Sequence, residues 1–321
     1  MRQKTIVLLG LAVLLPLSAA SQPASQAPQR PTESVTVTGI KPSAKVIDDF
    51  VLSHTAPTRV LGKIARWKSP ICPLTMGLGE KYAPFVSQRI RRLAAQIGAP
   101  VDADKNCKPN IRVVFTTRPQ ELMDNIRRDH PDYLGYYQSR LQSAQLAAIT
   151  HPIQSWYTTA TLDLRGRPQI DSGQGGGISI DVIIPGGNSL TPGGSSSGAT
   201  TRIELPNASS MNVSGNRMND GLSSTFFNVL VVAEPAKLLD VPLGTLADYI
   251  AMLALSQPGK LEGCAEFPTI LNLLVPDCPR IATNLTDGDL AYLKALYKMT
   301  PANTLSAQRG EMRYQMVQEL K

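Results

Sequence analysis

Residues 225–234 read TFFNVLVVAE, and this stretch decides the fold class. Its aromatic and β-branched side chains predict a strand. Residues 153–164, IQSWYTTATLDL, have the same character and predict another strand earlier in the chain. After both strands, residues 243–255, 286–298 and 306–321 are predicted to be helical. Strands packed with helices in this way predict an α+β fold.

Helices and strands also alternate upstream of these stretches. Helices are predicted at residues 44–56, 80–97 and 119–128, and strands at 64–78 and 111–115. Gly98 suits the C-cap of the second helix, and Thr117 suits the N-cap of the third. Together with the later elements they predict a single α+β domain over residues 40–321, built as a mixed sheet with packed helices.

The N-terminal residues predict export from the cytoplasm. Basic Arg2 and Lys4 precede an apolar run, and Ser18-Ala19-Ala20 ends it with small residues, as in a cleavable signal peptide spanning residues 1–20. Residues 21–39 are rich in Ser, Gln, Pro and Ala and predict a disordered tether. No later stretch has the apolar length of an integral membrane span. We therefore expect a periplasmic or extracellular protein.

Residues 165–222 differ from the rest of the domain in composition. They hold half of the chain's 24 glycines, with many Ser, Asn and Thr residues. Such a segment buries too little apolar surface to offset its ordering entropy, so it predicts a flexible insert, with one short strand at Ser179–Ile184.

Four cysteines in an exported chain predict disulfide bonds. Three pairings are formally open. Cys72–Cys107 and Cys264–Cys278 are favoured because each pair lies on one side of the insert. A zinc site is the alternative, but the C-x2-C spacing typical of such sites is absent.

The sequence contains no motif in a context that would support catalysis or cofactor binding. His54, His130 and His151 are too widely spaced for one helix face to present two imidazoles to a metal ion. Gly194 to Gly198 match G-x-S-x-G, but the motif lies in a Gly/Ser run without the strand and helix that a nucleophile elbow needs. Arg89, Arg91 and Arg92 read as a solvated helix face rather than a nucleic-acid footprint. We expect no cofactor, no metal site and no nucleic-acid partner.

The run LTDGDLAYLKALY at residues 285–297 resembles the final helix of metzincin-type zinc peptidases. That resemblance implies a zincin-like layout and aligns residues 243–255 with the helix that carries HExxH in the family. Asp248 would then stand where the catalytic glutamate stands, and Ala247 and Ala251 where two zinc ligands should be. Alanine binds no zinc, so the resemblance implies a degenerate, pseudopeptidase-like module.

The chain also resembles exported bacterial proteins built from a signal, a tether and a domain, a resemblance that implies no activity. Our main hypothesis is a non-catalytic exported protein that binds a protein, peptide or envelope component at an aromatic groove beside Trp156 and Tyr157. The alternative is a secreted or periplasmic, peptidase-like hydrolase whose site the sequence does not reveal. A third hypothesis gives the binding role to the insert, ordering on contact.

Overall fold

The computed structural model describes residues 41–104, 106–172, 179–184, 199–204, 221–300 and 304–321. The predicted signal, the tether and the serine motif at residues 194–198 lie outside these ranges. In the described residues, no helix combines the length and apolar content needed to cross a membrane.

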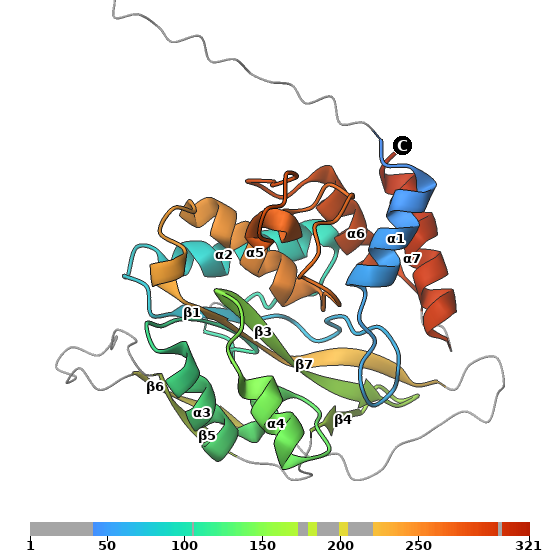
Figure 1. The fold of residues 1–321 in the computed structure, drawn as a ribbon. Helices are drawn as coiled ribbons and strands as arrows, with labels where there is room; N and C mark the ends of the chain where they lie inside the picture. Colours follow the sequence, from blue (N-terminus) through green and yellow to red (C-terminus); the bar gives the residue numbers. More distant parts are fainter. Residues whose placement is uncertain (1–40, 105, 173–178, 185–198, 205–220, 301–303) are drawn as a thin grey trace, which may run out of the picture. The chain divides into compact units, whose positions relative to one another are not determined.

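A mixed five-stranded sheet lies at the centre of the fold, in the order β1-β2-β7-β3-β4 (Figure 1). Its strands are β1 (Pro73–Met76), β2 (Ile111–Phe115), β7 (Ser223–Ala233), β3 (Ile153–Leu162) and β4 (Pro168–Asp171). Strands β1, β2 and β7 run parallel, whereas β3 is antiparallel to both β7 and β4. The TFFNVLVVAE stretch therefore forms a central strand, with β2 on one side and β3 on the other.

Helices cover both faces of this sheet (Figure 1). One face packs against α1 (Ala44–His54), α2 (Ala83–Ile97), α5 (Leu243–Leu255), α6 (Asp287–Lys298), α7 (Leu305–Glu319) and the 3-10 turn η3 (Ile270–Leu274). The other face packs against α3 (Pro119–Asp129), the 3-10 turn η1 (Pro131–Leu134) and α4 (Arg140–Ala147). Successive strand residues alternate between the two cores, as Val113 and Val114 do. The predicted α+β class is confirmed.

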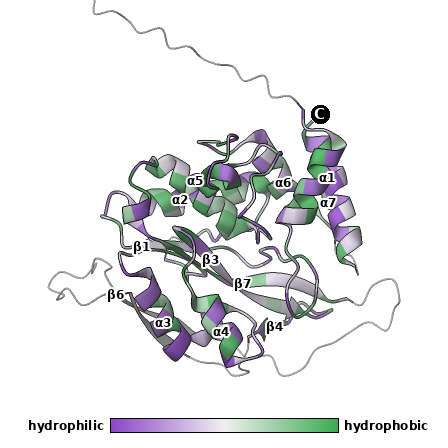
Figure 2. Cartoon of the chain, in the orientation of Figure 1, coloured by the Kyte–Doolittle hydropathy of each residue, from purple (hydrophilic) through white to green (hydrophobic). Residues whose placement is uncertain are grey.

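The hydropathy of the helices matches this layering. Every residue of α5 from Thr245 to Leu255 is buried, because this helix lies between the sheet and the outer helices. Helix α3 buries only Leu122, Met123 and Ile126 and is largely hydrophilic in Figure 2. Its apolar residues therefore form one narrow stripe facing the sheet.

Two helix ends agree with the sequence, and one does not. Gly98 caps α2 in the left-handed conformation, at φ +81°. Thr286 and Asp289 form a reciprocal capping box at the start of α6. Thr117 does not cap α3, however: Arg118 occupies the N-cap, and its N–H donates to the Thr116 hydroxyl at 3.1 Å. Helix α3 starts with a proline, which has no N–H and so needs no hydrogen-bond acceptor at that position.

The predicted strand at residues 64–78 is wrong over most of its length. Only Pro73–Met76 joins the sheet as a strand. Arg66 and Ile71 form single bridges to different partners, Thr225 and Val101. Pro70 and Pro73 lack the N–H that a continuous ladder requires, so the segment changes partners instead of forming one long strand.

The described parts of the range assigned to a flexible insert contain three strands. Pro168–Asp171 is the edge strand β4 of the main sheet, so the insert boundary at residue 165 is wrong. The Asp171 carboxylate accepts hydrogen bonds from the hydroxyls of Thr159 and Thr161 at 2.8 and 2.9 Å, which fastens β4 to β3. The predicted strand Ser179–Ile184 (β5) is confirmed and pairs with β6 (Ala199–Glu204) in a separate two-stranded sheet.

Both favoured cysteine pairs are present as disulfides. Cys72–Cys107 joins the residue before β1 to the loop that leads into β2, with 5.9 Å between the Cα atoms. Cys264–Cys278 closes the loop around η3, with 5.3 Å between the Cα atoms. Each bond therefore lies within one half of the chain.

Candidate functional site

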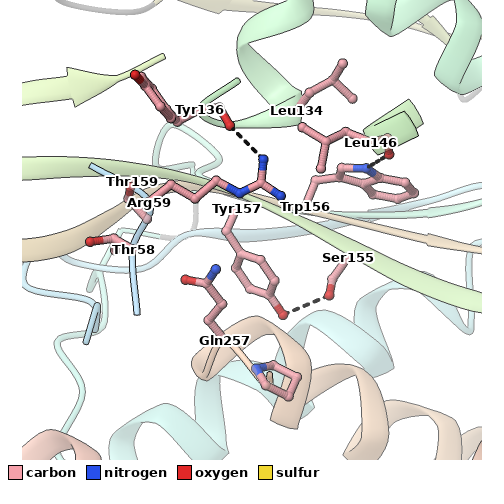
Figure 3. Close-up of a pocket in the computed structure, with 11 residues that line it drawn as sticks. Thr58, Arg59, Leu134, Tyr136, Leu146, Ser155, Trp156, Tyr157, Thr159 and Gln257 are labelled. Atoms are coloured by element: carbon pink, nitrogen blue, oxygen red, sulfur yellow. Dashed lines mark hydrogen bonds between the residues drawn. The ribbon is translucent and has the colours of Figure 1, made fainter. Parts of the chain in front are cut away.

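A pocket of about 220 Å³ opens beside Trp156 and Tyr157 on strand β3 (Figure 3). We call it the Trp156 pocket. It is lined by residues from four parts of the fold: Thr58 and Arg59 after α1, Leu134, Tyr136 and Leu146 around η1 and α4, Ser155, Trp156, Tyr157 and Thr159 on β3, and Gln257 and Pro258 after α5. The pocket thus lies where the sequence suggested an aromatic groove, beside Trp156 and Tyr157.

The pocket lies along a free edge of the sheet. Among the described residues, strand β4 pairs with β3 only from Thr159 onward, so the earlier residues of β3 have a described strand partner, β7, on one side only. The Val229 N–H donates to the Asn110 carbonyl at 2.9 Å, so Val229 turns its backbone groups away from β3. Tyr157 is the partner of Val229 in the β3–β7 register, so its N–H and C=O must also point away from the neighbouring strand β7. Ser155 lies two residues earlier on β3 and therefore directs its backbone groups to the same side as Tyr157. The Ser155 groups can pair with an added chain, whereas Gly135 covers the Tyr157 carbonyl.

The hydroxyl groups of Ser155 and Tyr157 are engaged in internal hydrogen bonds. The Tyr157 hydroxyl donates to the Leu253 carbonyl at 2.9 Å and lies 2.8 Å from the Ser155 hydroxyl, which is then the donor to it. Burial raises the pKa of Tyr157 well above its ordinary value, so the phenol stays neutral. Neither hydroxyl is paired with a histidine or carboxylate that would activate it.

Among the polar lining residues, Arg59 keeps hydrogen-bond donors for a ligand. Arg59 is the one charged side chain among the lining residues, and its Nη1 donates to the Tyr136 carbonyl at 3.1 Å (Figure 3). The Oε1 atom of Gln257 is shielded from solvent and has no hydrogen-bond partner. Apolar contact is supplied by Leu134, Leu146 and Trp156, and the Trp156 indole is fixed by a 2.6 Å bond to the Leu146 carbonyl. This arrangement combines one cation with an apolar wall, which is binding chemistry.

The degenerate-site residues lie on α5, away from the pocket lining. Ala247 and Ala251 are fully buried in the helix core. Asp248 is buried too, and its carboxylate accepts from the Arg89 guanidinium of α2 and from the Leu285 N–H at 3.2 Å. Asp248 thus joins α2, α5 and the segment before α6.

The three histidines occupy separate places. His54 is buried at the end of α1, where its Nδ1 lies 2.8 Å from the Ser53 hydroxyl. His130 is the C-cap of α3, and the Nδ1 of His151 lies 2.7 Å from the Thr150 hydroxyl. None lines the Trp156 pocket. Among the residues described, no group of three or more His, Cys, Asp and Glu side chains is placed to hold a metal ion.

Sequence reasoning missed Arg59, Tyr136 and Gln257. Each lies in an irregular segment, where no periodicity signals burial or proximity. The Arg59 and Gln257 segments approach one another through the backbone bond from the Ala56 N–H to the Gln257 carbonyl, at 3.2 Å, which a sequence pattern does not encode.

Comparison with known proteins finds no matching family model, no matching curated protein and no matching solved structure.

Proposed function

We propose that this chain is an exported, non-catalytic binding protein that captures a protein, peptide or cell-envelope component at the Trp156 pocket. The observation that carries the proposal is the coincidence of this pocket with the edge of β3 at Ser155, which directs its backbone groups outward and has no strand partner on that side among the described residues. Sheet edges beside side-chain pockets bind extended peptides, since the backbone supplies affinity and the pocket supplies specificity. The favoured ligand is therefore a peptide or a peptide segment of an envelope component.

The chemistry of the lining supports binding over turnover. Ser155 has no adjacent base, and Tyr157 is held as a neutral phenol by its bond to the Leu253 carbonyl. A hydrolase would need an activated nucleophile or water beside the bound chain. Location in the periplasm or outside the cell belongs to the same proposal, and it is supported by two disulfides that persist in an oxidising compartment.

The proposal is tested by selecting peptides from a random displayed library against the full exported chain. Selected peptides are then measured by fluorescence anisotropy with the wild type and with Ser155→Phe, whose ring would occupy the pocket. Ser69→Phe is the matched control, because Ser69 is exposed and lies outside the lining. We expect Ser155→Phe to weaken binding by about tenfold or more, and Ser69→Phe to leave it unchanged.

Mass spectrometry of the incubated peptides provides the second readout. Intact peptides agree with a binding protein. Cleaved peptides would favour the hydrolase alternative, and equal binding by both phenylalanine variants would place recognition elsewhere on the chain.

A further inference from the structure

We infer that the Trp156 pocket recognises the C-terminal residue of a peptide, with the free carboxylate bound by Arg59 and an apolar last side chain against Trp156. This inference rests on the proposed function and specifies which part of a peptide binds. Four features of the pocket carry it.

The first feature is a barrier at one end of the free edge. Gly135 lies against the outward-pointing carbonyl of Tyr157 so closely that a Cβ atom on it would stand 2.3 Å from that oxygen. The Leu134–Tyr136 segment therefore crosses the edge of β3 at Tyr157. An extended chain that pairs with Ser155 cannot continue past this point, so the site suits a chain end rather than an internal segment.

The second feature is size. An engineered protein cavity of about 150 Å³ holds benzene, whereas pockets for whole drug-sized ligands span roughly 300–1,000 Å³. At about 220 Å³, the Trp156 pocket has room for a ring-sized side chain and a small polar group. This volume therefore fits the side chain and the carboxylate of a single peptide residue.

The third feature is the charge. Arg59 is the one charged residue of the described lining, and among the described residues only its Nη1 is engaged, on the Tyr136 carbonyl. A guanidinium has five N–H donors in a planar fork, and two of them fit a carboxylate. The hydrogen bond to the Tyr136 carbonyl holds the Arg59 guanidinium beside the Leu134–Tyr136 segment, where the end of the bound peptide would lie (Figure 3). An anionic chain end is the carboxyl terminus, so the peptide binds with this end toward Arg59.

The fourth feature is the apolar wall. Leu134, Leu146 and Trp156 form the wall against which the last side chain packs. The class of ligand is thus a peptide ending in an aromatic or large aliphatic residue with a free carboxylate.

The test compares N-acetyl-Gly-Ala-Phe as the free acid with the same peptide as its C-terminal amide, by calorimetry on the full exported chain. Internal Asp in N-acetyl-Gly-Asp-Ala-amide is the third probe, because it carries a carboxylate on a side chain. We expect the acid to bind about tenfold or more tightly than the amide, and the third probe to bind no better than the amide.

The variants are Arg59→Gln and the matched control Arg92→Gln, since Arg92 is an exposed arginine on α2 outside the lining. Arg59→Gln should reduce the preference for the acid to less than about twofold, and Arg92→Gln should retain it. Equal binding of acid and amide by the wild type, or a preference that survives in Arg59→Gln, overturns the inference.

The two proposals fail in different ways. If library peptides bind in a manner sensitive to Ser155→Phe while acid and amide bind alike, the binding function stands and the C-terminal inference falls. If no library peptide depends on the pocket, the binding function itself falls.

Discussion

Arg89 on α2 and Asp248 on α5 form a bidentate ion pair, in which the guanidinium Nε and Nη2 donate to the two carboxylate oxygens. The Asp248 side chain is 2 % exposed and that of Arg89 is 35 % exposed. The pair raises the pKa of Arg89 above its ordinary value through the hydrogen bond to Asp248. The residue that the metzincin resemblance aligned with a catalytic glutamate is thus committed to a contact between helices.

Replacing this aspartate should cost stability. In Asp248→Asn the neutral amide cannot pair with the Arg89 charge, and the Leu285 N–H loses a charged acceptor. We expect the free energy of unfolding to fall by about 2–4 kcal/mol, at the lower side of the range for buried pairs because Arg89 is partly solvated. Urea unfolding measures the change. Asp49→Asn, which breaks the exposed Lys45–Asp49 pair, is the control and should change it by at most about 0.5 kcal/mol.

His54 should make stability depend on pH. Burial lowers the pKa of His54 from 6.5 to about 4. In the unfolded chain His54 takes up a proton near pH 6.5, whereas in the native protein it stays neutral down to about pH 4. The free energy of unfolding therefore falls as the pH falls from about 6.5 to about 4. Between pH 7 and 4.5, wild type should lose about 2 kcal/mol more than His54→Gln.

Urea unfolding of the two proteins at both pH values isolates this contribution. Buried carboxyl groups such as Asp171 and Asp289, whose pKa burial raises, are present in both proteins and cancel in the difference. Parallel pH dependence in wild type and His54→Gln would contradict the assignment.

The two disulfides should differ modestly in their contribution to stability. They span sequence separations of 35 and 14 residues. In the loop-entropy model these lengths correspond to about 4 and about 3 kcal/mol. Unfolding of the Cys72→Ala/Cys107→Ala and Cys264→Ala/Cys278→Ala proteins measures the two losses. A negligible loss in either protein would show that its disulfide restrains the unfolded chain little.

Metal content separates the binding proposal from the peptidase alternative. Helix α5 presents buried Ala247 and Ala251 where the resemblance would require ligands. We expect elemental mass spectrometry of the dialysed protein to find less than about a tenth of an equivalent of zinc. Stoichiometric zinc would contradict this expectation and revive the peptidase alternative.

Local patterns predicted the regular elements and missed the contacts between them. Strand Ile111–Phe115, helix Leu243–Leu255 and the Thr286 cap follow from side-chain periodicity and capping chemistry, which act over a few residues. The break in residues 64–78 depends on which distant strand each part meets, as Arg66 meets Thr225. No local pattern contains that information.

The same distinction holds at the candidate site. Trp156 and Tyr157 were predictable as an aromatic pair on a strand, because their chemistry is visible in sequence. Arg59 and Gln257 reach the pocket only through tertiary packing of two irregular segments. The metzincin resemblance aligned Asp248 with a catalytic glutamate, whereas in the fold its carboxylate pairs with Arg89.

Gly135, which lies between the lining residues Leu134 and Tyr136, should be sensitive to substitution. Its backbone has φ +74° and ψ −154°, a region open essentially to glycine alone. Gly166 shares φ +74°, but an added Cβ there would contact nothing within 4 Å, so Gly166→Ala carries backbone strain without a clash. In Gly135→Ala the new methyl group also collides with the Tyr157 carbonyl.

We expect Gly166→Ala to reduce the free energy of unfolding by about 1 kcal/mol and Gly135→Ala by about 2–4 kcal/mol. The collision should also move the Leu134–Tyr136 segment away from β3, and with it the Tyr136 carbonyl that holds Arg59. Gly135→Ala should therefore weaken binding of the free-acid peptide about tenfold, whereas Gly166→Ala should leave it unchanged. Urea unfolding and calorimetry measure the two effects, and equal values for the two alanine variants would mean that the Gly135–Tyr157 approach does not shape the pocket.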